Sequence, residues 1–442
     1  MQYIRTLLEK LVSFNTINDP QANLRPTSEC ANFISSFLDT KCSIKSEIII
    51  DDDFYNVFGQ IGSGSPHILL LAHFDTVPVR PDQWNTNPFE LIVRGDEAYG
   101  RGALDNKSGV TILLMVAKAL SESLKGIGTV SFVFSGDEEI GGLHGVNKIR
   151  EKLVRENQLP DFIINCDANG ERITTRRRNG FGIFLNVPRI KTVIKGNKVQ
   201  KRFETKIEGR EMRHSAYFLP GIDQHALLKA SKFLRDHGDW EILSIKEHAF
   251  VKSNVIPEYI TLEIIAPSEE GKNWMVESSL KDLFQSLLAF SRINFPTEPS
   301  DFGINSLPNL LRLDNENIEV YFDVRAMVSD SSTVQSTFEL LAAEKFDEST
   351  LRIVGGRGFL NTSKNEFIVQ LASQLAKEYS INPNPFELEG ASDSRYFSQD
   401  NIPIIEIGPL GGNLHGNNEY VQLSSLKRVV SFVRALVEKL LS

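Results

Sequence analysis

The feature that most constrains the fold of this chain is a set of short, unbroken apolar segments, each about as long as one β-strand and each followed by polar residues. The first lies within HILLLAHFD at residues 67–75, and three more occupy residues 129–135, 161–166 and 403–407. Continuous apolar runs of this length are typical of strands that are buried on both faces of a sheet. We therefore expect these four segments to be central strands.

Helical patterns separate the first three segments. Residues 106–122 carry apolar side chains at helical spacing, and so do residues 4–12, 365–379 and 424–441. Strands that alternate with helices indicate an α/β fold, with a mixed, mostly parallel sheet flanked by helices.

The middle of the chain, after residue 179, has a different pattern. Long strand-like runs are joined there by two helical stretches, predicted over residues 222–236 and 274–290. This order indicates a smaller α+β domain, of the ferredoxin-like kind, inserted into the first domain. The predicted boundaries are residues 1–178 and 356–442 for the α/β domain and 179–355 for the inserted domain.

The charge of the chain argues against one class of partner. Lys and Arg total 48 and Asp and Glu total 57, so the net charge of −9 repels nucleic acid and anionic membranes over most of the surface. The one basic run, residues 176–178, is too short for a binding stripe, and we expect a solvated strand end or turn there. No nucleic-acid partner is predicted.

Cysteine usage and hydropathy predict a cytoplasmic protein without a membrane span. Cys30, Cys42 and Cys166 are odd in number and lack C-x-x-C spacing, so we expect free thiols in a reducing compartment. The N-terminal residues follow a helical pattern instead of a secretory core. The most apolar stretch, residues 111–120, is far shorter than the roughly 20 residues of a bilayer span.

Polar residues follow each of the four apolar segments. They are His73 and Asp75, then Glu138 and Glu139, then Asp167, then His415. Ligands of open α/β sheets bind beyond the carboxyl ends of the strands, so one site built from four loops is implied. Taken singly, such residues are more often caps or hydrogen-bonded loop residues. Asp105 is also a good N-cap for the next helix, and residues 137–139 also fit a solvated acidic turn.

Four motifs make the sequence similar to one family. The strings LLLAHFDTVPV, YGRGALDNKSG, FSGDEEIGG and LHGNNEYV, in this order and at these separations, resemble the M20 family of co-catalytic zinc amidohydrolases. That family includes acetylornithine deacetylase, succinyl-diaminopimelate desuccinylase, aminoacylases, carboxypeptidases and dipeptidases. The resemblance spans nearly the whole chain and implies a metal-dependent enzyme that hydrolyses an amide bond.

The resemblance also implies a centre with two Zn²⁺ ions, for which Co²⁺ or Mn²⁺ are possible substitutes. Its terminal ligands are expected to be His73 and Asp167 on one ion and Glu139 and His415 on the other, with Asp105 as the bridge. Mixed imidazole and carboxylate ligands suit Zn²⁺, and two ions can share an activated water while they polarise the scissile carbonyl.

Two catalytic roles follow from the same resemblance. Asp75 corresponds to the residue behind His73 that orients its imidazole, and the His-x-Asp spacing in an extended segment agrees with this role. Glu138 corresponds to the general base, which takes a proton from water and passes it to the leaving amine.

The inserted domain contains a further motif. The segment GREMRHSA at residues 209–216 resembles the family strand end whose histidine reaches the partner subunit's active site and stabilises the tetrahedral oxyanion. That histidine is His214 here, and its alternative interpretation is a plain surface residue. The resemblance makes the inserted domain a lid and dimerisation domain and the working enzyme a homodimer.

Three segments are expected to bind the substrate. Arg325 ends FDVR, which resembles the family strand whose arginine grips the substrate carboxylate. Two asparagines compete for a nearby role: Asn254 has the better local sequence and Asn305 the better distance from Arg325, and we prefer Asn305. Arg395 lies in GASDSRYF, which resembles a pocket-lining segment and is otherwise a helix-starting turn.

The sequence has features of two branches of the family, which act on different classes of substrate. Asn106 and Asp167 resemble the peptidase-like members, whereas NEYV at residues 418–421 resembles the desuccinylase and deacetylase branch. The expected substrate is a short peptide or an N-acyl amino acid. A catalytically silent binding or assembly member is the remaining alternative, which the complete set of ligand and base positions disfavours.

Overall fold

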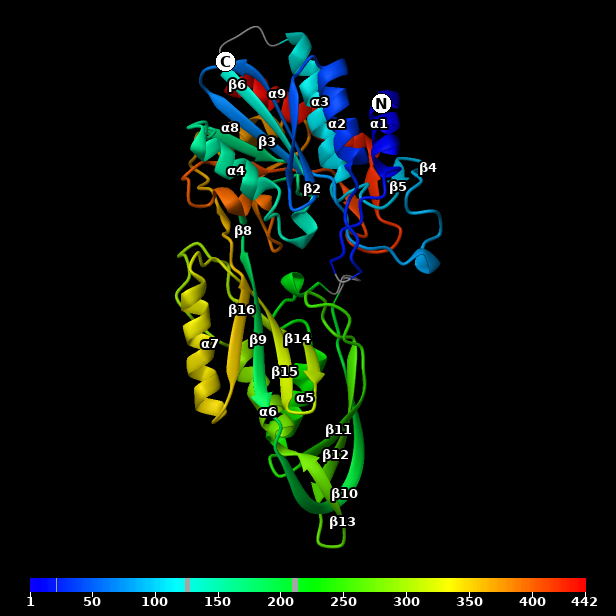
Figure 1. Ribbon diagram of the computed structural model, residues 1–442, viewed down its shortest axis with the longest axis vertical. Coiled ribbons are helices and arrows are strands. Elements are labelled where there is room, and N and C mark those ends of the chain that lie inside the picture. The colour runs from blue at the N-terminus through cyan, green and yellow to red at the C-terminus, as the bar shows by residue number, and fades with distance from the viewer. Residues whose placement is uncertain (21, 124–127, 209–213) are drawn as a thin grey trace. The chain divides into compact units, whose positions relative to one another are not determined.

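The computed structural model describes all residues except 21, 124–127 and 209–213, and it divides into two compact units (Figure 1). Unit 1 comprises Met1–Arg177 and Phe359–Ser442, and unit 2 comprises Arg178–Gly358. These boundaries differ from the expected ones by one residue at the first crossing and three residues at the second.

Within the described residues, unit 1 is built on a nine-stranded sheet of order β1-β2-β6-β3-β7-β19-β8-β17, with β18 paired to β8. The strands are β1 (Ser46–Asp51), β2 (Phe54–Ser63), β3 (His67–His73), β6 (Gly128–Ser135), β7 (Phe162–Asn165), β8 (Arg172–Arg177), β17 (Leu360–Asn361), β18 (Asn382–Leu388) and β19 (Ile404–Glu406). The neighbours β6, β3, β7 and β19 run parallel, and antiparallel strands flank them. The predicted α/β fold with a mixed sheet is confirmed.

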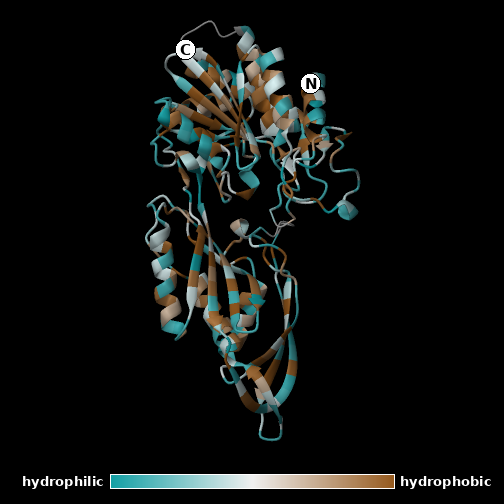
Figure 2. Cartoon of the chain, viewed as in Figure 1, coloured by the Kyte–Doolittle hydropathy of each residue, from teal (hydrophilic) through white to brown (hydrophobic). Residues whose placement is uncertain are grey.

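The four apolar segments of the sequence form these four central strands. Every residue of β3 and β6 is buried, because both faces of the sheet are covered. Ile68 and Leu70 belong to the larger core, and Leu69 and Leu71 belong to the core on the opposite face. Figure 2 shows these strands mostly brown, which explains why the sequence does not alternate between apolar and polar residues.

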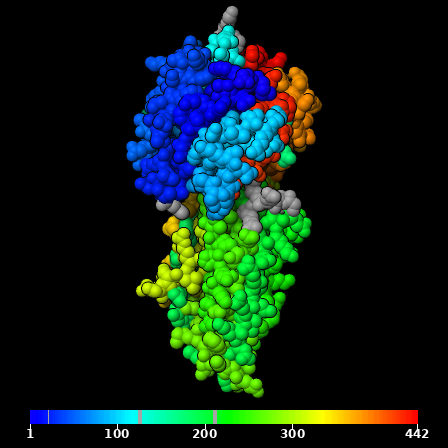
Figure 3. Space-filling view, turned by 90° about the vertical axis from the view of Figure 1, so that its right-hand side faces the viewer, coloured from blue at the N-terminus to red at the C-terminus, as the bar shows by residue number. Residues whose placement is uncertain are grey.

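Helices cover the two faces of this sheet. The larger core contains α1 (Gln2–Val12), α2 (Ser28–Lys41), α3 (Lys107–Ser123), α8 (Phe367–Ala376) and α9 (Leu423–Leu440), and the other core contains α4 (Val146–Arg155). Both α1 and α9 pack against α3, and Figure 3 shows the blue and red ends of the chain in the same unit. No helix in the described part of the chain is long and apolar enough to cross a membrane.

A small sheet connects two loops that matter for the site. Its strands are β4 (Ile92–Arg94), β5 (Glu97–Tyr99), β20 (Gly411–Gly412) and β21 (Tyr420–Gln422). Because β5 pairs with β21, the segment that leads to Asp105 runs beside the segment that follows His415.

The described part of unit 2 holds two four-stranded antiparallel sheets, of order β14-β15-β9-β16 and β11-β12-β10-β13. Its elements are β9 (Asn179–Pro188), β10 (Lys191–Glu204), α5 (Ala226–Asp236), β11 (Glu241–His248), β12 (Tyr259–Pro267), β13 (Lys272–Glu277), α6 (Ser278–Ser291), β14 (Asn305–Leu313), β15 (Asn317–Ala326), α7 (Ser331–Lys345) and β16 (Thr350–Gly355). A ferredoxin-like domain has one such sheet. Here the consecutive strands β9 and β10 belong to different sheets, so the unit is larger than that expectation.

The predicted helix at residues 274–290 is wrong over its first turn. Residues 274–277 lie in β13, where Trp274 pairs with Ile194 and Val276 with Thr192 of β10. Aromatic and β-branched residues favour a pleated, half-buried surface, so the cross-strand partners outweigh the helical spacing.

The helix predicted from residue 222 begins later, at Ala226. His225 caps it, since its Nδ1 accepts a hydrogen bond from the backbone N–H of Leu227 at 3.2 Å. Ile222, which the prediction placed in the helix, is exposed in the preceding turn.

The basic run at residues 176–178 lies at a strand end, as predicted, because Arg177 is the last residue of β8. The predicted solvation is wrong for two of its three residues, since Arg176 is partly exposed and the other two arginines are buried. Arg177 is 7% exposed and forms an ion pair with Glu406 in unit 1. Arg178 is 6% exposed, and its guanidinium lies 4.0 Å from the ring centre of Phe302 in unit 2. A charge run lies on the surface only when the fold offers it no buried partners, and here the fold does.

Candidate metal centre

The carboxyl ends of the central strands bring together two groups of potential metal ligands. The first group is His73, the last residue of β3, with Asp105 and Asp167. The second group is Asp105, Glu139 and His415. Within each group the ligand atoms lie within 4.8 Å of one another.

Asp105 belongs to both groups, and its two carboxylate oxygens face different imidazoles. Oδ1 lies 3.0 Å from Nε2 of His73, and Oδ2 lies 2.9 Å from Nε2 of His415. A second carboxylate completes each group: Asp167 Oδ1 lies 3.4 Å from Nε2 of His73, and Glu139 Oε2 lies 3.3 Å from Nε2 of His415. A carboxylate placed in this way could bridge two cations.

The donor atoms fit a pair of divalent cations. Each group offers one imidazole and two carboxylates, a combination that suits Zn²⁺. The Oε1 atom of Glu139 is buried and has no hydrogen-bond partner among the described residues. A buried carboxylate oxygen without a partner is costly, and a bound cation removes that cost.

The charges of the two groups shift one another's pKa. Burial disfavours the charged form of His73, but the Asp167 carboxylate and the hydrogen bond to Asp105 outweigh it, so the pKa of His73 lies well above 6.5. The same balance, with Glu139 and Asp105 as the acids, raises the pKa of His415. Burial raises the pKa of Asp167 to about 6. Protons and cations therefore compete for this cluster.

Asp75 lies behind His73. Its Oδ1 is 3.2 Å from Nδ1 of His73, and its carboxylate accepts the backbone N–H groups of Glu138 and Glu139, each at 3.1 Å. The side chain of Asn18 donates a further hydrogen bond at 3.0 Å. The buried Asp75 carboxylate thus orients the imidazole and also holds the turn that carries Glu139.

Glu138 lies outside both ligand groups. Its Oε1 accepts a hydrogen bond from Nη2 of Arg395 at 3.3 Å. Burial raises the pKa of Glu138 well above its usual value, and the Arg395 charge opposes this shift. The segment of Arg395 does start a short helix, η4 (Asp393–Phe397), yet its guanidinium faces Glu138. A solvated acidic turn at residues 137–139 is excluded, because Asp137 is fully buried.

The predicted residues of the inserted region lie together in unit 2. Residues 209–213 of the histidine motif lie outside the described residues. Nδ1 of His214 accepts the backbone N–H of Ala216 at 3.1 Å, and Nε2 lies 3.2 Å from Nδ2 of Asn254.

Arg325 and Asn305 are cross-strand partners in β15 and β14. The guanidinium of Arg325 forms two hydrogen bonds with Asp323, at 2.9 and 3.1 Å, and Asp323 also accepts the hydroxyl of Ser215. Nδ2 of Asn305 donates to the Ser215 carbonyl at 2.9 Å. A Cβ atom on Gly180 would lie 2.7 Å from Nη1 of Arg325, so glycine leaves room for the guanidinium.

Comparison with known proteins identifies the family. Residues 69–439 match the family model described as peptidase family M20/M25/M40. The chain belongs to this peptidase family. The predicted family and class of activity are confirmed: this M20 member is a metal-dependent amide hydrolase.

Relatives and solved structures agree with this membership. The M20 chain is 25% identical over 369 residues to a succinyl-diaminopimelate desuccinylase of Erythrobacter litoralis (strain HTCC2594), over 82% of this chain and 78% of the relative. The aminoacylhistidine dipeptidase of Vibrio alginolyticus has a TM-score of 0.68 at 15% identity, with 99% and 96% of the two chains covered. A dinuclear metal binding peptidase of the M20 family from Bacillus subtilis has a TM-score of 0.55 at 15% identity, with 100% and 98% covered. Because both structures are only 15% identical to this chain, they show that the fold is shared and nothing more.

Sequence analysis assigned no role to two charged residues of this M20 chain. Arg101 and Glu419 form a buried ion pair, with Nη1 and Oε2 2.6 Å apart. Both lie inside motifs that carry predicted ligands, YGRGALDNKSG and LHGNNEYV. The sequence did contain a signal for this pair, since each of the two motifs carries one residue of opposite charge. Asn106, treated only as a departure from the family pattern, donates to the carbonyl of Cys166 at 2.8 Å.

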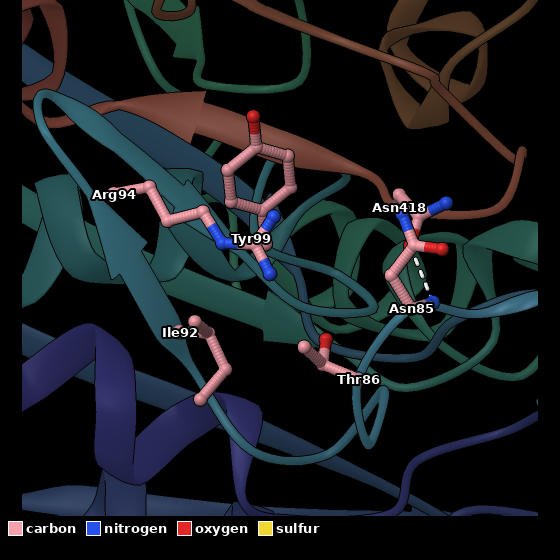
Figure 4. A pocket seen from close by; sticks show the side chains of 6 residues that line it. All are labelled: Asn85, Thr86, Ile92, Arg94, Tyr99 and Asn418. Atoms are coloured by element: carbon pink, nitrogen blue, oxygen red, sulfur yellow. Dashed lines mark hydrogen bonds between the residues drawn. The ribbon is translucent and has the colours of Figure 1, made fainter.

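A small pocket in unit 1 of the M20 chain contains none of the predicted site residues (Figure 4). It is lined by Asn85, Thr86, Ile92, Arg94, Tyr99 and Asn418. The backbone N–H of Asn85 donates to Oδ1 of Asn418 at 2.8 Å across it. The pocket lies beside the small sheet, on the loop that continues from His415.

Proposed function

We propose that this M20 enzyme hydrolyses an amide bond next to a free carboxylate, in a short peptide or an N-acyl amino acid, at a centre of two Zn²⁺ ions. The proposed ligands are His73 and Asp167, Glu139 and His415, and the bridging Asp105. The observation that carries the proposal is the position of Asp105, whose two oxygens face two imidazoles at 3.0 and 2.9 Å. Co²⁺ and Mn²⁺ are accepted by the same donor types.

Glu138 is the proposed general base. When bound, the cations supply a lowered pKa for water and a polarised scissile carbonyl. The Glu138 carboxylate takes the proton of the attacking water and delivers it to the leaving amine. Its Oε1 accepts a hydrogen bond from Arg395, and Asp75 fixes its backbone.

Substrate recognition is assigned to residues of both units. Arg325 and Arg395 are proposed to bind substrate carboxylates, because a guanidinium offers two parallel donors. Asn305 is retained as a substrate contact, although its amide nitrogen already holds the turn after His214. His214 is proposed to stabilise the oxyanion in the partner subunit's site, so the enzyme works as a homodimer through the inserted unit.

A desuccinylase-type deacylase is the second candidate function. The similarity to the Erythrobacter desuccinylase over 82% of this chain favours it. Arg395 beside Glu138 adds a second guanidinium, which suits an acyl group with its own carboxylate. A catalytically silent member is disfavoured, because the ligands and the base are all present.

The proposed location is the cytoplasm. Cys30, Cys42 and Cys166 are free and buried, as a reducing compartment allows. Burial raises the pKa of Cys30 to about 12 and that of Cys42 to about 11, so these thiols stay protonated at neutral pH.

The proposal is tested with purified protein, a dipeptide panel, acetylornithine and succinyl-diaminopimelate, each with and without a chelator. Hydrolysis of dipeptides alone identifies a peptidase, and hydrolysis of the acyl substrates alone identifies a deacylase. Glu138→Ala is expected to lower kcat by about 10²- to 10⁴-fold while zinc content is retained. Glu139→Ala is the matched control, since it should lose zinc as well. Unchanged turnover of Glu138→Ala would refute its role as the base.

A further inference from the structure

The carboxylate of Glu419 is buried at 0% exposure beneath the loop that carries Asp105. Its Oε1 accepts the backbone N–H groups of Leu104 at 2.8 Å and of Asp105 itself at 2.9 Å. Its Oε2 accepts the N–H of Gly102 at 3.1 Å and Nη1 of Arg101 at 2.6 Å. One carboxylate thus takes four donors from residues 101–105, and three of them are backbone groups.

The other side of Arg101 reaches the loop of His415. Its Nη2 lies 3.0 Å from the carbonyl oxygen of Gly416 and 3.4 Å from that of His415. The guanidinium is 1% exposed and lies 5.4 Å from the ring centre of Trp84, so water does not compete for these bonds. Arg101 is therefore bonded to Glu419 and to the backbone of a predicted metal ligand at the same time.

The backbone of His415 needs such support. Its φ is +58°, in the left-handed region that non-glycine residues rarely adopt. Residues in that region keep their conformation only when the surrounding structure holds them. The Arg101 contact to the His415 carbonyl is one such constraint. It acts on the residue whose imidazole faces Oδ2 of Asp105 at 2.9 Å.

The partners of this ion pair include two predicted metal ligands. The pair also bonds backbone groups of residues that are not predicted ligands, such as Pro78 and Gly102. Among the ligands, it contacts the N–H of Asp105 and the carbonyl of His415, which lie more than three hundred residues apart in the chain. Groups that orient metal ligands in this way commonly set the metal affinity.

We infer that Glu419 and Arg101 are positioning residues that hold the Asp105 loop and the His415 loop at the separation which two cations require. This inference rests on the proposed two-cation function. Glu419 holds the residue shared by both sites. The one predicted ligand whose backbone Arg101 contacts is His415, and the same Nη2 also lies 3.4 Å from the carbonyl oxygen of Pro78. Substitutions of Glu419 and of Arg101 should therefore cause different losses of metal binding.

Glu419→Gln is the first test. In either orientation of the amide, its NH₂ group meets N–H donors that the carboxylate accepted, so the Asp105 loop loses part of its anchor. Because Asp105 belongs to both ligand groups, both Zn²⁺ affinities should fall by about 10- to 100-fold. The measurement is equilibrium competition with a chromophoric chelator, together with zinc stoichiometry after dialysis.

Arg101→Lys is the second test. It keeps the positive charge beside Glu419 but cannot bond the carboxylate and the His415 carbonyl together. One Zn²⁺ affinity should stay at the wild-type value and the other should fall by about tenfold or more. This milder variant decides the matter by itself if Glu419→Gln does not yield folded protein.

Glu277→Gln in unit 2 is the matched control. Glu277 is 7% exposed and accepts a hydrogen bond from Nε of Arg189 at 3.2 Å, so its substitution also removes a partly buried ion pair. It should lower the melting temperature and leave both zinc affinities unchanged. Folded Glu419→Gln and Arg101→Lys proteins that bind two Zn²⁺ ions as tightly as wild type would overturn the inference. Failure of the wild-type protein itself to bind zinc would instead overturn the proposed function.

Discussion

The ligand cluster of unit 1 and the Arg325 cluster of unit 2 compensate their charges differently. In unit 1 the three carboxylates of the two ligand groups face two imidazoles, and a buried oxygen of Glu139 has no partner in the described structure. In unit 2 the guanidinium of Arg325 is matched by the carboxylate of Asp323 through two hydrogen bonds. The first cluster is incomplete without added positive charge, whereas the second is complete by itself. Metal dependence should therefore be a property of unit 1 alone.

Removal of divalent cations tests this contrast most strongly. Dialysis against a chelator should abolish amide hydrolysis and increase hydrogen exchange in peptides that cover residues 136–142 and 413–418. Peptides that contain Arg325 should not change, because no predicted ligand lies in unit 2. Restored zinc at about a hundredfold its Kd should add about 2.7 kcal/mol to the free energy of unfolding. Equal changes of exchange in both units would contradict the contrast.

The histidines of the two units should respond to pH in opposite directions. In metal-free unit 1 the pKa values of His73 and His415 are raised, so their stabilisation is present below pH 6.5 and is lost as pH rises through the folded-state values. In unit 2, burial lowers the pKa of His225 to about 4, and the neighbouring Asn309 side chain opposes this shift only in part. The unfolded chain then takes up the proton first as pH falls. Stability is lost between pH 6.5 and about 4, by roughly 3 kcal/mol.

His225→Asn measures that loss. Asparagine also caps helices, so the variant keeps an acceptor for the Leu227 N–H and removes the titrating ring. Urea unfolding at about pH 7 and about pH 4.5 should show a smaller acid loss for the variant than for wild type. His248→Asn, at an exposed position, should leave the acid loss unchanged. Parallel curves for wild type and His225→Asn would show that His225 does not cause the loss.

Arg325→Lys separates recognition from metal binding. Lysine keeps the charge but cannot present two parallel donors to a carboxylate. We expect KM to rise about 10- to 100-fold with little change in kcat, which corresponds to about 1.4–2.7 kcal/mol. Zinc content should stay at the wild-type value. Arg352→Lys, at an exposed position of the same sheet, is the control and should change neither quantity. A loss of zinc in Arg325→Lys would show that the Arg325 cluster affects metal binding and would contradict the contrast.

Gly180→Ala is the mildest change. The added methyl group would lie 2.7 Å from Nη1 of Arg325, and the flexible guanidinium end can shift to avoid it. KM should rise by only a few fold, and the free energy of unfolding should change by less than about 1 kcal/mol. A change of KM as large as that of Arg325→Lys would mean that the Arg325 position tolerates no displacement.

Much of the fold could be predicted because its signals are local, and the candidate site could be predicted because four motifs resemble one family. The central strands are short apolar runs, and the ligands follow them directly, so His73 and Asp167 were found at strand ends. The burial of Arg177 could not be predicted, because its partner Glu406 lies more than two hundred residues away. The strand at residues 274–277 was missed for a similar reason, since its pairing with Ile194 is a non-local contact.

By itself the sequence determined the α/β class and the central strands, because strand-length hydrophobicity is written in consecutive residues, and its four motifs indicated the set of residues able to hold cations. Tertiary structure alone decided which imidazole each oxygen of Asp105 faces, that Glu419 anchors the same loop, and that unit 2 contains two sheets. These features are contacts between distant segments. They depend on strand order and on the packing of buried charges, neither of which is encoded within any one segment.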